Sequence, residues 1–395
     1  MANWKELEKK YYVQLLNRVP VTLVKGQGAR VWDDEGKEYL DFVAGWAVDC
    51  LGHAHPVITE ALITQSRILL QTSNQFFTVP QVELAELLVK NSCLDRVWLG
   101  NSGLEANEAA IKLARRWGAL KLNGAYEIIT THNSFHGRSL ATTAATGQDK
   151  FHKPYEPLPD WFQSVPYNDL AAVQAATSAK TCAIMLEPVQ GEGGVNVPDA
   201  GYLKGVRQWC DEKNLLLIFD EIQTGVCRLG PLWGYEAFGV EPDIMTLAKG
   251  LGGGVPIGAM LARERCSVFA FGDHGSTFGG NPLTCAAAVA VLDHIIAHDF
   301  PKKVKEVSGY LFAELKKLKQ EFAVISEVRG MGLLAAVAFN ADISQEVLQG
   351  CLERGLLINA VKPNAVRLMP PLIITNKEVD EAIGILRTVL SGRTT

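Results

Sequence analysis

An acid and an amine follow two apolar runs in the middle of the chain. Residues 215–219 lead directly into Asp220 and Glu221, and residues 244–248 end at Lys249, which precedes a glycine cluster. Short apolar runs without alternation are typical of strands that are covered on both faces in a parallel sheet. Because ligands bind outside the carboxyl ends of such strands, we expect the carboxylate and the amine to meet at one edge of a sheet.

An aspartate and a lysine at one edge are the two groups that pyridoxal phosphate chemistry requires. The amine forms a Schiff base with the aldehyde, and the carboxylate keeps the pyridine nitrogen protonated so that the ring can accept electrons. An ordinary wet strand end also collects polar residues, so this pair alone leaves that alternative open. A pyridoxal phosphate site must in addition bind a phosphate and a substrate.

Two segments are candidates for the phosphate contact. RVWLGNSGLEANEAAIKLARRW predicts a strand, a tight loop and a helix, with Ser102 and Glu105 as a capping box. Ser and Gly in the first turn offer free N–H groups and the positive end of the helix dipole to an anion, although an ordinary capped helix has the same pattern. Ser276 and Thr277 lie in a glycine-rich segment, GDHGSTFGGNP, whose backbone can approach a ligand closely.

Aromatic and charged residues after two further predicted strands are candidates for ring and substrate contacts. Phe135 and Arg138 in THNSFHGRSL could stack on a planar cofactor and bind a substrate carboxylate; core packing and a surface ion pair are the alternatives. Glu187 and Glu192 follow in EPVQGEGG. Glu192 can hold Arg367 until an acidic substrate replaces it, because breaking a buried pair costs ~3–5 kcal/mol.

Composition excludes several other classes of function. The chain has 395 residues, 48% of them hydrophobic, and a net charge of −5 that argues against nucleic acid as the main partner. Its eight cysteines include no C-x-x-C pair, which favours free thiols in a reducing compartment over disulfides or zinc. We expect no metal site at His53 and His55, no secretion signal and no membrane span, and therefore a cytoplasmic protein.

Helices alternate with apolar runs from Val57 onward. We expect helices at residues 56–70, 80–91, 104–120, 169–176 and 202–213, and strands at 96–99, 126–130, 182–186, 215–219, 244–247 and 257–261. This alternation predicts an α/β fold with a mainly parallel sheet, in a large domain of residues 57–275. Residues 276–395 predict a smaller domain of helices and short strands, against which the N-terminal segment 1–56, with a short helix and a hairpin, is expected to pack.

The order of the motifs resembles one enzyme family over nearly the whole chain. NSGLEANEAAIKLAR, SFHGR, EPVQGEGG, DEIQTGV, LAKGLGGGVPIGAML and HGSTFGGNP are similar to motifs of the class III, pyridoxal-phosphate-dependent aminotransferases. AGWAV, LGHAHP and NAVKPNAVRLMPPLIIT are most similar to the acetylornithine aminotransferase branch. The resemblance implies the aspartate-aminotransferase fold, also called fold type I, with a large domain, a smaller α+β domain and an active site at the interface of a homodimer.

The resemblance also implies which residues bind pyridoxal 5′-phosphate. They are Ser102, Gly103, Phe135, Asp220, Glu221, Ile222, Gln223, Lys249 and Thr277. Lys249 and Asp220 would be catalytic, as the Schiff-base lysine and the partner of the pyridine nitrogen. Gln223 would contact the ring hydroxyl, and Thr277 would reach the phosphate from the other subunit.

Substrate roles follow from the same resemblance. Arg138 would bind the α-carboxylate of the substrate, and Ser276 would contact the amino donor. Glu192 and Arg367 would form a pair that switches between the two substrates. Trp46 and Leu104 depart from the residues usual in the family near the substrate end.

The implied reaction moves the ω-amino group of N2-acetylornithine to 2-oxoglutarate, giving N-acetylglutamate 5-semialdehyde and glutamate in arginine biosynthesis. Another ω-amino donor (succinyldiaminopimelate, ornithine, γ-aminobutyrate or an aminoadipate-pathway substrate) and a pyridoxal phosphate aminomutase stay open as alternatives. A nucleotide-binding module is the alternative from another class, but residues 250–254 lack a GKS or GKT ending, and no G-x-G-x-x-G opens a helix after the first strand.

Overall fold

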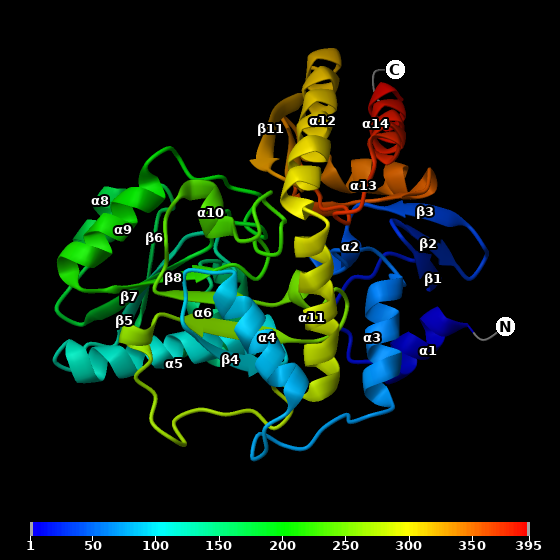
Figure 1. The fold of residues 1–395 in the computed structure, drawn as a ribbon. Coiled ribbons are helices and arrows are strands. Elements are labelled where there is room, and N and C mark those ends of the chain that lie inside the picture. Colours follow the sequence, from blue (N-terminus) through cyan, green and yellow to red (C-terminus); the bar gives the residue numbers. More distant parts are fainter. Residues whose placement is uncertain (1–2, 393–395) are drawn as a thin grey trace.

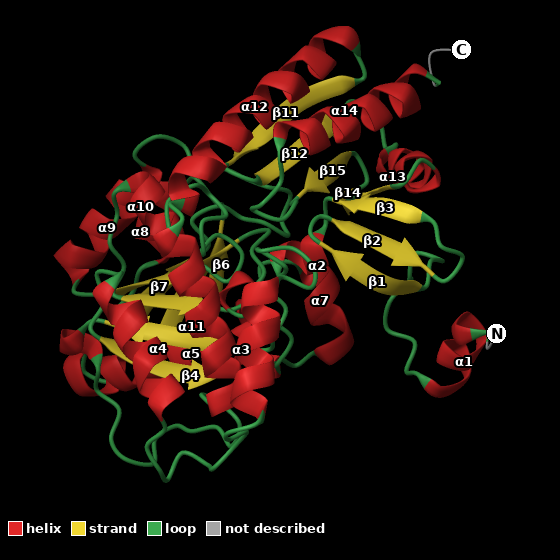
Figure 2. Cartoon of the chain, turned by 45° about the vertical axis from the view of Figure 1, so that its right-hand side comes forward, coloured by secondary structure: helices red, strands yellow, loops and turns green. Residues whose placement is uncertain are grey.

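Residues 3–392 are described by the computed structural model, and their strands form three sheets (Figure 1). Residues 1–2 and 393–395, which are the outer ends of the predicted N-terminal segment and small domain, lie outside the described residues. The seven-stranded sheet lies in the larger of two bodies, and the two four-stranded sheets lie together beside it (Figure 2).

The large sheet has the strand order β4-β10-β9-β8-β7-β5-β6. Its strands are β4 (Arg96–Gly100), β5 (Glu127–Thr131), β6 (Phe162–Val165), β7 (Thr181–Leu186), β8 (Leu216–Asp220), β9 (Ile244–Leu247) and β10 (Gly258–Ala262). Neighbours from β9 to β6 are parallel, whereas β10 is antiparallel to both β4 and β9. The prediction of a mainly parallel sheet is confirmed, although the sequence did not predict β6.

Helices on both faces of this sheet explain its uninterrupted apolar strands. In β8, Leu216 and Ile218 pack into the core beneath α5 (Gly103–Lys121). Leu217 and Phe219 point to the opposite face, which α9 (Tyr202–Lys213) helps to cover. Since successive residues of a strand alternate between the faces, a strand covered on both sides reads as a continuous apolar run.

Most of the remaining helices of the large body surround the sheet. They are α2 (Ala44–Ala47), α3 (Pro56–Ser66), α4 (Val79–Lys90), α6 (Leu140–Ala145), α7 (Asp149–His152), α8 (Leu170–Ala176), α10 (Gly234–Phe238) and α11 (Pro282–Ala297), with 3-10 turns η1 (Lys153–Tyr155), η2 (Lys249–Leu251) and η3 (Glu264–Cys266). Helix α11 packs against α3 and α4, so it lies with the large body although it follows residue 275.

The smaller body contains the other two sheets. One sheet has the order β11-β12-β15-β14 and is contacted by α12 and α13, against which α14 packs; the other has the order β1-β2-β3-β13. Their elements are β1 (Leu23–Gln27), β2 (Arg30–Asp33), β3 (Glu38–Asp41), α12 (Phe300–Glu321), β11 (Ile325–Met331), β12 (Leu334–Phe339), α13 (Ser344–Glu353), β13 (Leu356–Leu357), β14 (Asn359–Lys362), β15 (Ala365–Leu368) and α14 (Asn376–Ser391). The parallel pairing of β3 with β13 joins the N-terminal segment to the C-terminal part of the chain. The N-terminal helix α1 covers Trp4–Tyr11 and ends well before Pro20.

No single helix within residues 3–392 is long and apolar enough to cross a membrane. Helices α11 and α12 meet the length and composition criteria only as a pair, and a bend of 72° separates them.

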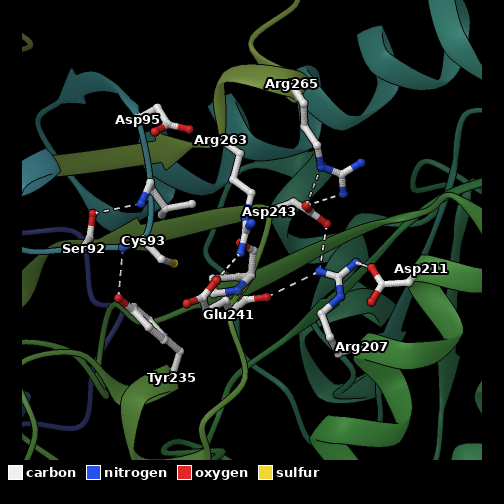
Figure 3. Close-up of polar contacts among 12 residues, drawn as sticks. Ser92, Cys93, Asp95, Arg207, Asp211, Tyr235, Glu241, Asp243, Arg263 and Arg265 are labelled. Carbon is white, nitrogen blue, oxygen red and sulfur yellow. Dashed lines mark hydrogen bonds and ion pairs between the residues drawn. The ribbon is translucent and has the colours of Figure 1, made fainter.

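A network of ion pairs closes the amino end of the large sheet (Figure 3). Asp243, directly before β9, is buried and pairs with both Arg207 and Arg265; its Oδ2 atom also accepts the N–H of Leu217, at 2.9 Å. Arg263 pairs with Glu241 beside it. Each of these arginines is thus matched by a carboxylate, and the network holds α9, β8, β9 and the segment after β10 together, at the opposite end of β9 from Lys249.

Candidate active site

A cavity of about 570 Å³ lies at the carboxyl ends of β7, β8 and β9. Most of the predicted site residues line it: Ser102, Gly103, Phe135, Arg138, Glu192, Asp220, Ile222, Gln223, Lys249 and Arg367. The ends of β8 and β9, the loops after β5 and β7 and the N-terminus of α5 therefore meet here, as the parallel arrangement of the strands predicts. Arg367 reaches the cavity from β15 of the smaller body.

Lys249 follows β9 and lies in a backbone conformation that lysine seldom adopts. Its φ angle is +44°, in the left-handed region, where the backbone strain of a residue other than glycine is of order 1–3 kcal/mol. Burial lowers the pKa of Lys249, and the nearby Asp220 carboxylate opposes that shift. The strained turn brings into the cavity an amine whose pKa is lowered, as a nucleophilic lysine requires.

The Asp220 carboxylate is held by two side chains and one backbone group. Its Oδ2 atom accepts hydrogen bonds from Asn107 Nδ2 at 2.7 Å and from His136 Nδ1 at 2.8 Å. Its Oδ1 atom accepts the N–H of Ile222 at 3.1 Å. The carboxylate is 3% exposed and lines the cavity, so its direction is determined by these donors. Sequence reasoning missed Asn107 and His136, although His136 lies between Phe135 and Arg138 in the SFHGR motif.

The N-terminus of α5 forms one end of the cavity. Ser102 is its N-cap, and the Ser102 Oγ atom accepts the N–H of Glu105 at 3.2 Å. The Glu105 carboxylate accepts the N–H of Asn101 at 2.7 Å, one residue before the N-cap, so the predicted capping box is shifted. A Cβ atom at Gly103 would lie 2.7 Å from Ile222 Cδ1. Glycine at this position lets the helix end approach the cavity closely, with its first N–H groups available to an anion.

Phe135 and Arg138 lie on the loop after β5. The Phe135 ring lines the cavity and packs edge-to-face on Phe151, with centroids 5.8 Å apart. The Arg138 guanidinium lies 4.2 Å from the Phe151 ring centroid. Within residues 3–392 Arg138 forms no ion pair, which leaves its donors available to a ligand carboxylate.

The predicted pair of Glu192 and Arg367 is in contact. Arg367 Nη2 lies 3.3 Å from Glu192 Oε2, and Arg367 also donates to Gln223 Oε1 at 3.2 Å and Asn359 Oδ1 at 2.8 Å. Burial lowers the pKa of Arg367, whereas Glu192 opposes that shift. Among residues 3–392, the buried Arg367 Nε atom has no hydrogen-bond partner. Arg367 is therefore a nearly enclosed cation whose donors are not all satisfied, while Glu192 reaches partly into solvent.

Three predicted residues do not line the cavity of this chain. The Glu221 carboxylate points to the N-terminus of α10, where it accepts the N–H groups of Gly234 and, at 2.7 Å, Tyr235. Because neighbouring residues at a strand end alternate in direction, the side chains of Glu221 and Asp220 point to opposite sides. Ser276 Oγ accepts a hydrogen bond from Asn101 Nδ2, at 3.0 Å, and Thr277 is exposed.

Trp46 lies in a left-handed turn at the wall of the cavity. Residues 44–47 have φ angles of +47°, +62°, +65° and +66°, and the Trp46 side chain is 50% exposed. Consecutive residues in the left-handed conformation strain the backbone unless they are glycine, so contacts with the surrounding structure must stabilise this turn. The turn presents a large aromatic ring to the part of the cavity where the sequence departs from the usual family pattern.

Comparison with known proteins agrees with this arrangement. The family model for class-III aminotransferases matches residues 12–390. The chain belongs to the class-III aminotransferases.

The similar proteins include enzymes named for acetylornithine and enzymes named for ornithine. An acetylornithine aminotransferase of Caldanaerobacter subterraneus subsp. tengcongensis is 51% identical over 97% of this chain and 98% of its own length. An ornithine aminotransferase of Toxoplasma gondii, solved with partial occupancy of PLP at its active site, has a TM-score of 0.94 at 35% identity, covering 98% of this chain and 93% of its own. An N-acetylornithine aminotransferase of Stenotrophomonas maltophilia has a TM-score of 0.85 at 38% identity, covering 98% and 99% of the two chains.

Membership of the class-III aminotransferases confirms the predicted fold type and the predicted cofactor, pyridoxal 5′-phosphate. The cavity fits this cofactor on structural grounds. It joins a buried amine, a carboxylate on a strand end, an aromatic ring and a helix N-terminus whose first residue is a glycine packed against Ile222. Within residues 3–392, no cluster of three or more His, Cys, Asp or Glu residues has the arrangement of a metal site.

Proposed function

We propose that this aminotransferase moves the ω-amino group of N2-acetylornithine to 2-oxoglutarate, yielding N-acetylglutamate 5-semialdehyde and glutamate. The observation that carries the proposal is the convergence of Lys249, Asp220 and the Glu192–Arg367 pair on one cavity. The acetylated donor is supported by the acetylornithine aminotransferase of Caldanaerobacter subterraneus subsp. tengcongensis, which is 51% identical over 97% of this chain.

Residues at one end of the cavity suit the cofactor. We assign Lys249 as the residue that joins it covalently and Asp220 as the partner of its ring nitrogen. When bound, pyridoxal 5′-phosphate supplies an electron sink for the carbon that carries the amino group. Phe135 provides a flat apolar wall, and Ser102 and Gly103 provide donors for the phosphate.

Lys249 has the second task of moving a proton. Burial favours the uncharged form of its free amine, which would accept a proton from the substrate carbon. Asp220 keeps its direction throughout because His136 and Asn107 hold it from behind. The base is thus free to move while the carboxylate remains fixed.

Two arginines explain how one cavity can accept two substrates. The reacting carbon of each substrate must reach the same place near Lys249. Acetylornithine reacts at its far end and carries one carboxylate, which Arg138 can bind. In 2-oxoglutarate a second carboxylate lies next to the reacting carbon, and it requires another cation. Arg367 is that cation, and Glu192 neutralises it when the second carboxylate is absent.

We further propose a cytoplasmic homodimer in which Ser276 and Thr277 complete the site of the partner subunit. In support, Thr277 lies exposed and outside the cavity of its own chain. The division into an N-terminal segment, a large and a small domain is likewise our proposal. In support of a revised boundary, helix α11 packs with the large body, which favours a border between α11 and α12.

A panel of amino donors tests the function. The purified enzyme is assayed with 2-oxoglutarate and acetylornithine, ornithine, succinyldiaminopimelate or γ-aminobutyrate. We expect the highest kcat/KM with acetylornithine, and no multiple turnover when 2-oxoglutarate is omitted. A preference for another donor contradicts the proposed substrate, and turnover without 2-oxoglutarate indicates an aminomutase.

A further inference from the structure

A carboxylate with no assigned role lies between the two loops that carry the substrate and ring contacts. Glu187 directly follows β7, the strand between β8 and β5, and its side chain lines the cavity. The residue is 5% exposed, and within residues 3–392 it forms no ion pair. A buried carboxylate without a counter-ion is costly, so its presence at this place requires an explanation.

The hydrogen bonds of Glu187 connect these two loops. Its Oε2 atom accepts the N–H of Phe135 at 3.1 Å, on the loop of the ring-stacking residue. Its Oε1 atom accepts the N–H of Gly191 at 3.2 Å, next to Glu192. Each oxygen of one carboxylate therefore holds a different wall of the cavity. Gln190 joins the same loops farther along, where its Nε2 atom donates to the carbonyl of His132 at 2.8 Å.

We infer that Glu187 is a positioning residue, which fixes the ring-stacking loop of Phe135 relative to the Glu192 loop only while its carboxyl group is ionised. The inference rests on the proposed function, because it assumes that Phe135 and Glu192 act on cofactor and substrate.

The ionisation of Glu187 can change near neutral pH. Burial raises its pKa to about 7, against the pull of His136 and the two N–H groups, while Asp220 adds to the rise. Other groups that face it are Lys249, Arg367 and Glu192 in the cavity and the buried phenol of Tyr167 beneath it. A protonated carboxyl group keeps one good acceptor and turns an O–H toward the second N–H, so one of the two loops loses its bond.

Glu187→Gln mimics the protonated form, and Asp33→Asn is a matched control. Asp33 is also a buried carboxylate that accepts two backbone N–H groups, those of Glu35 at 3.0 Å and Lys37 at 2.8 Å, but it lies in the β1-β2-β3-β13 sheet outside the cavity. Loss of a charged acceptor is therefore common to both variants, and only Glu187→Gln acts on the site.

Isotope exchange between glutamate and 2-oxoglutarate by the holoenzyme measures the effect without acetylornithine. For Glu187→Gln we expect kcat/KM to fall about 10- to 100-fold, as for loss of a hydrogen bond to a charged group. We also expect the step near pH 7 in the wild-type pH profile to disappear. Asp33→Asn should lose stability but retain the wild-type activity and profile. A Glu187→Gln enzyme that behaves like Asp33→Asn, or that retains the step, overturns the inference.

Two further measurements cover the remaining cases. If Glu187→Gln does not fold, Glu187→Asp retains the charge but is too short to hold both loops, so it should keep the pH step with reduced activity; unreduced activity overturns the inference. If the wild-type enzyme shows no exchange, the proposed function fails instead. The inference is then tested by thermal unfolding of the wild type and Glu187→Gln between pH 5 and 8. Wild-type stability should fall as pH rises, and Glu187→Gln should reduce this fall. An unchanged dependence of stability on pH overturns the inference.

Discussion

Replacement of Arg367 tests whether one cavity discriminates between its substrates through a removable ion pair. In Arg367→Ala the cation that we assign to the near carboxylate of 2-oxoglutarate is lost. The acetylornithine half-reaction needs no cation at this place, because its only carboxylate is assigned to Arg138. We therefore expect a selective loss of 2-oxoglutarate, with the amino donor affected only indirectly.

The magnitude follows from the surroundings of Arg367. The side chain is 1% exposed, so a carboxylate that binds it is largely removed from water. Loss of one partner from a buried pair of charges costs ~3–5 kcal/mol, which corresponds to about 100- to 5,000-fold in kcat/KM. For the amino donor the remaining effect is the freed Glu192, whose side chain is 38% exposed and can be solvated. We expect that loss to stay below about tenfold.

Single-turnover absorbance changes of the cofactor measure each half-reaction separately. Arg138→Ala is the reciprocal control, because both substrates are proposed to place a carboxylate there, and it should weaken both. Arg367→Lys keeps the charge without the planar fork and should recover part of the 2-oxoglutarate reaction. Equal losses for the two substrates in Arg367→Ala would refute the proposed division of work between the arginines.

Three further predictions concern the cofactor, pH and assembly. Lys249→Ala should show no turnover and should no longer be fixed to the cofactor by borohydride, which absorbance and mass spectrometry measure; substantial residual transamination contradicts its assignment. Burial raises the pKa of Glu221 to about 8, so the folded state binds more protons than the unfolded state from about pH 4.5 to 8. Thermal stability should therefore fall as pH rises through this window, and Glu221→Gln should flatten the fall; an unchanged slope contradicts the shift. Mixing Lys249→Ala with Thr277→Ala protein should restore activity through hybrid dimers that contain one intact site, whereas no recovery argues against a shared site.

The strand ends of the site were predictable because the large sheet is covered on both faces. Uninterrupted apolar runs marked β8 and β9, and the parallel arrangement then placed Asp220 and Lys249 at one edge. The edge strand β6 was not predictable, because it is less covered than the central strands. Its sequence FQSV is only partly buried and contains two polar residues, so it has no apolar run.

The alternation of side chains, applied to single residues, predicts that Glu221 points away from Asp220. The motif DEIQ is continuous, yet the Glu221 carboxylate turns away to the N-terminus of α10. Adjacent residues at a strand end point in opposite directions, so a continuous motif cannot contribute every member to one cavity. Ile222, two residues after Asp220, again lines the cavity, and because the chain turns after the strand, Gln223 lines it as well.

The groups that support the site depend on contacts that sequence spacing does not reveal. Asn107 lies on a buried face of α5, among apolar residues with which it shares a helical pattern, and it reaches Asp220 across 113 positions of sequence. A second bond joins its Oδ1 atom to the hydroxyl of Thr246 on β9, the strand that leads to Lys249. One amide in the core therefore contacts the strands of both catalytic residues. Such a group satisfies buried polar atoms and at the same time sets the relative position of acid and amine, and only the packing of α5 on the sheet makes that role visible.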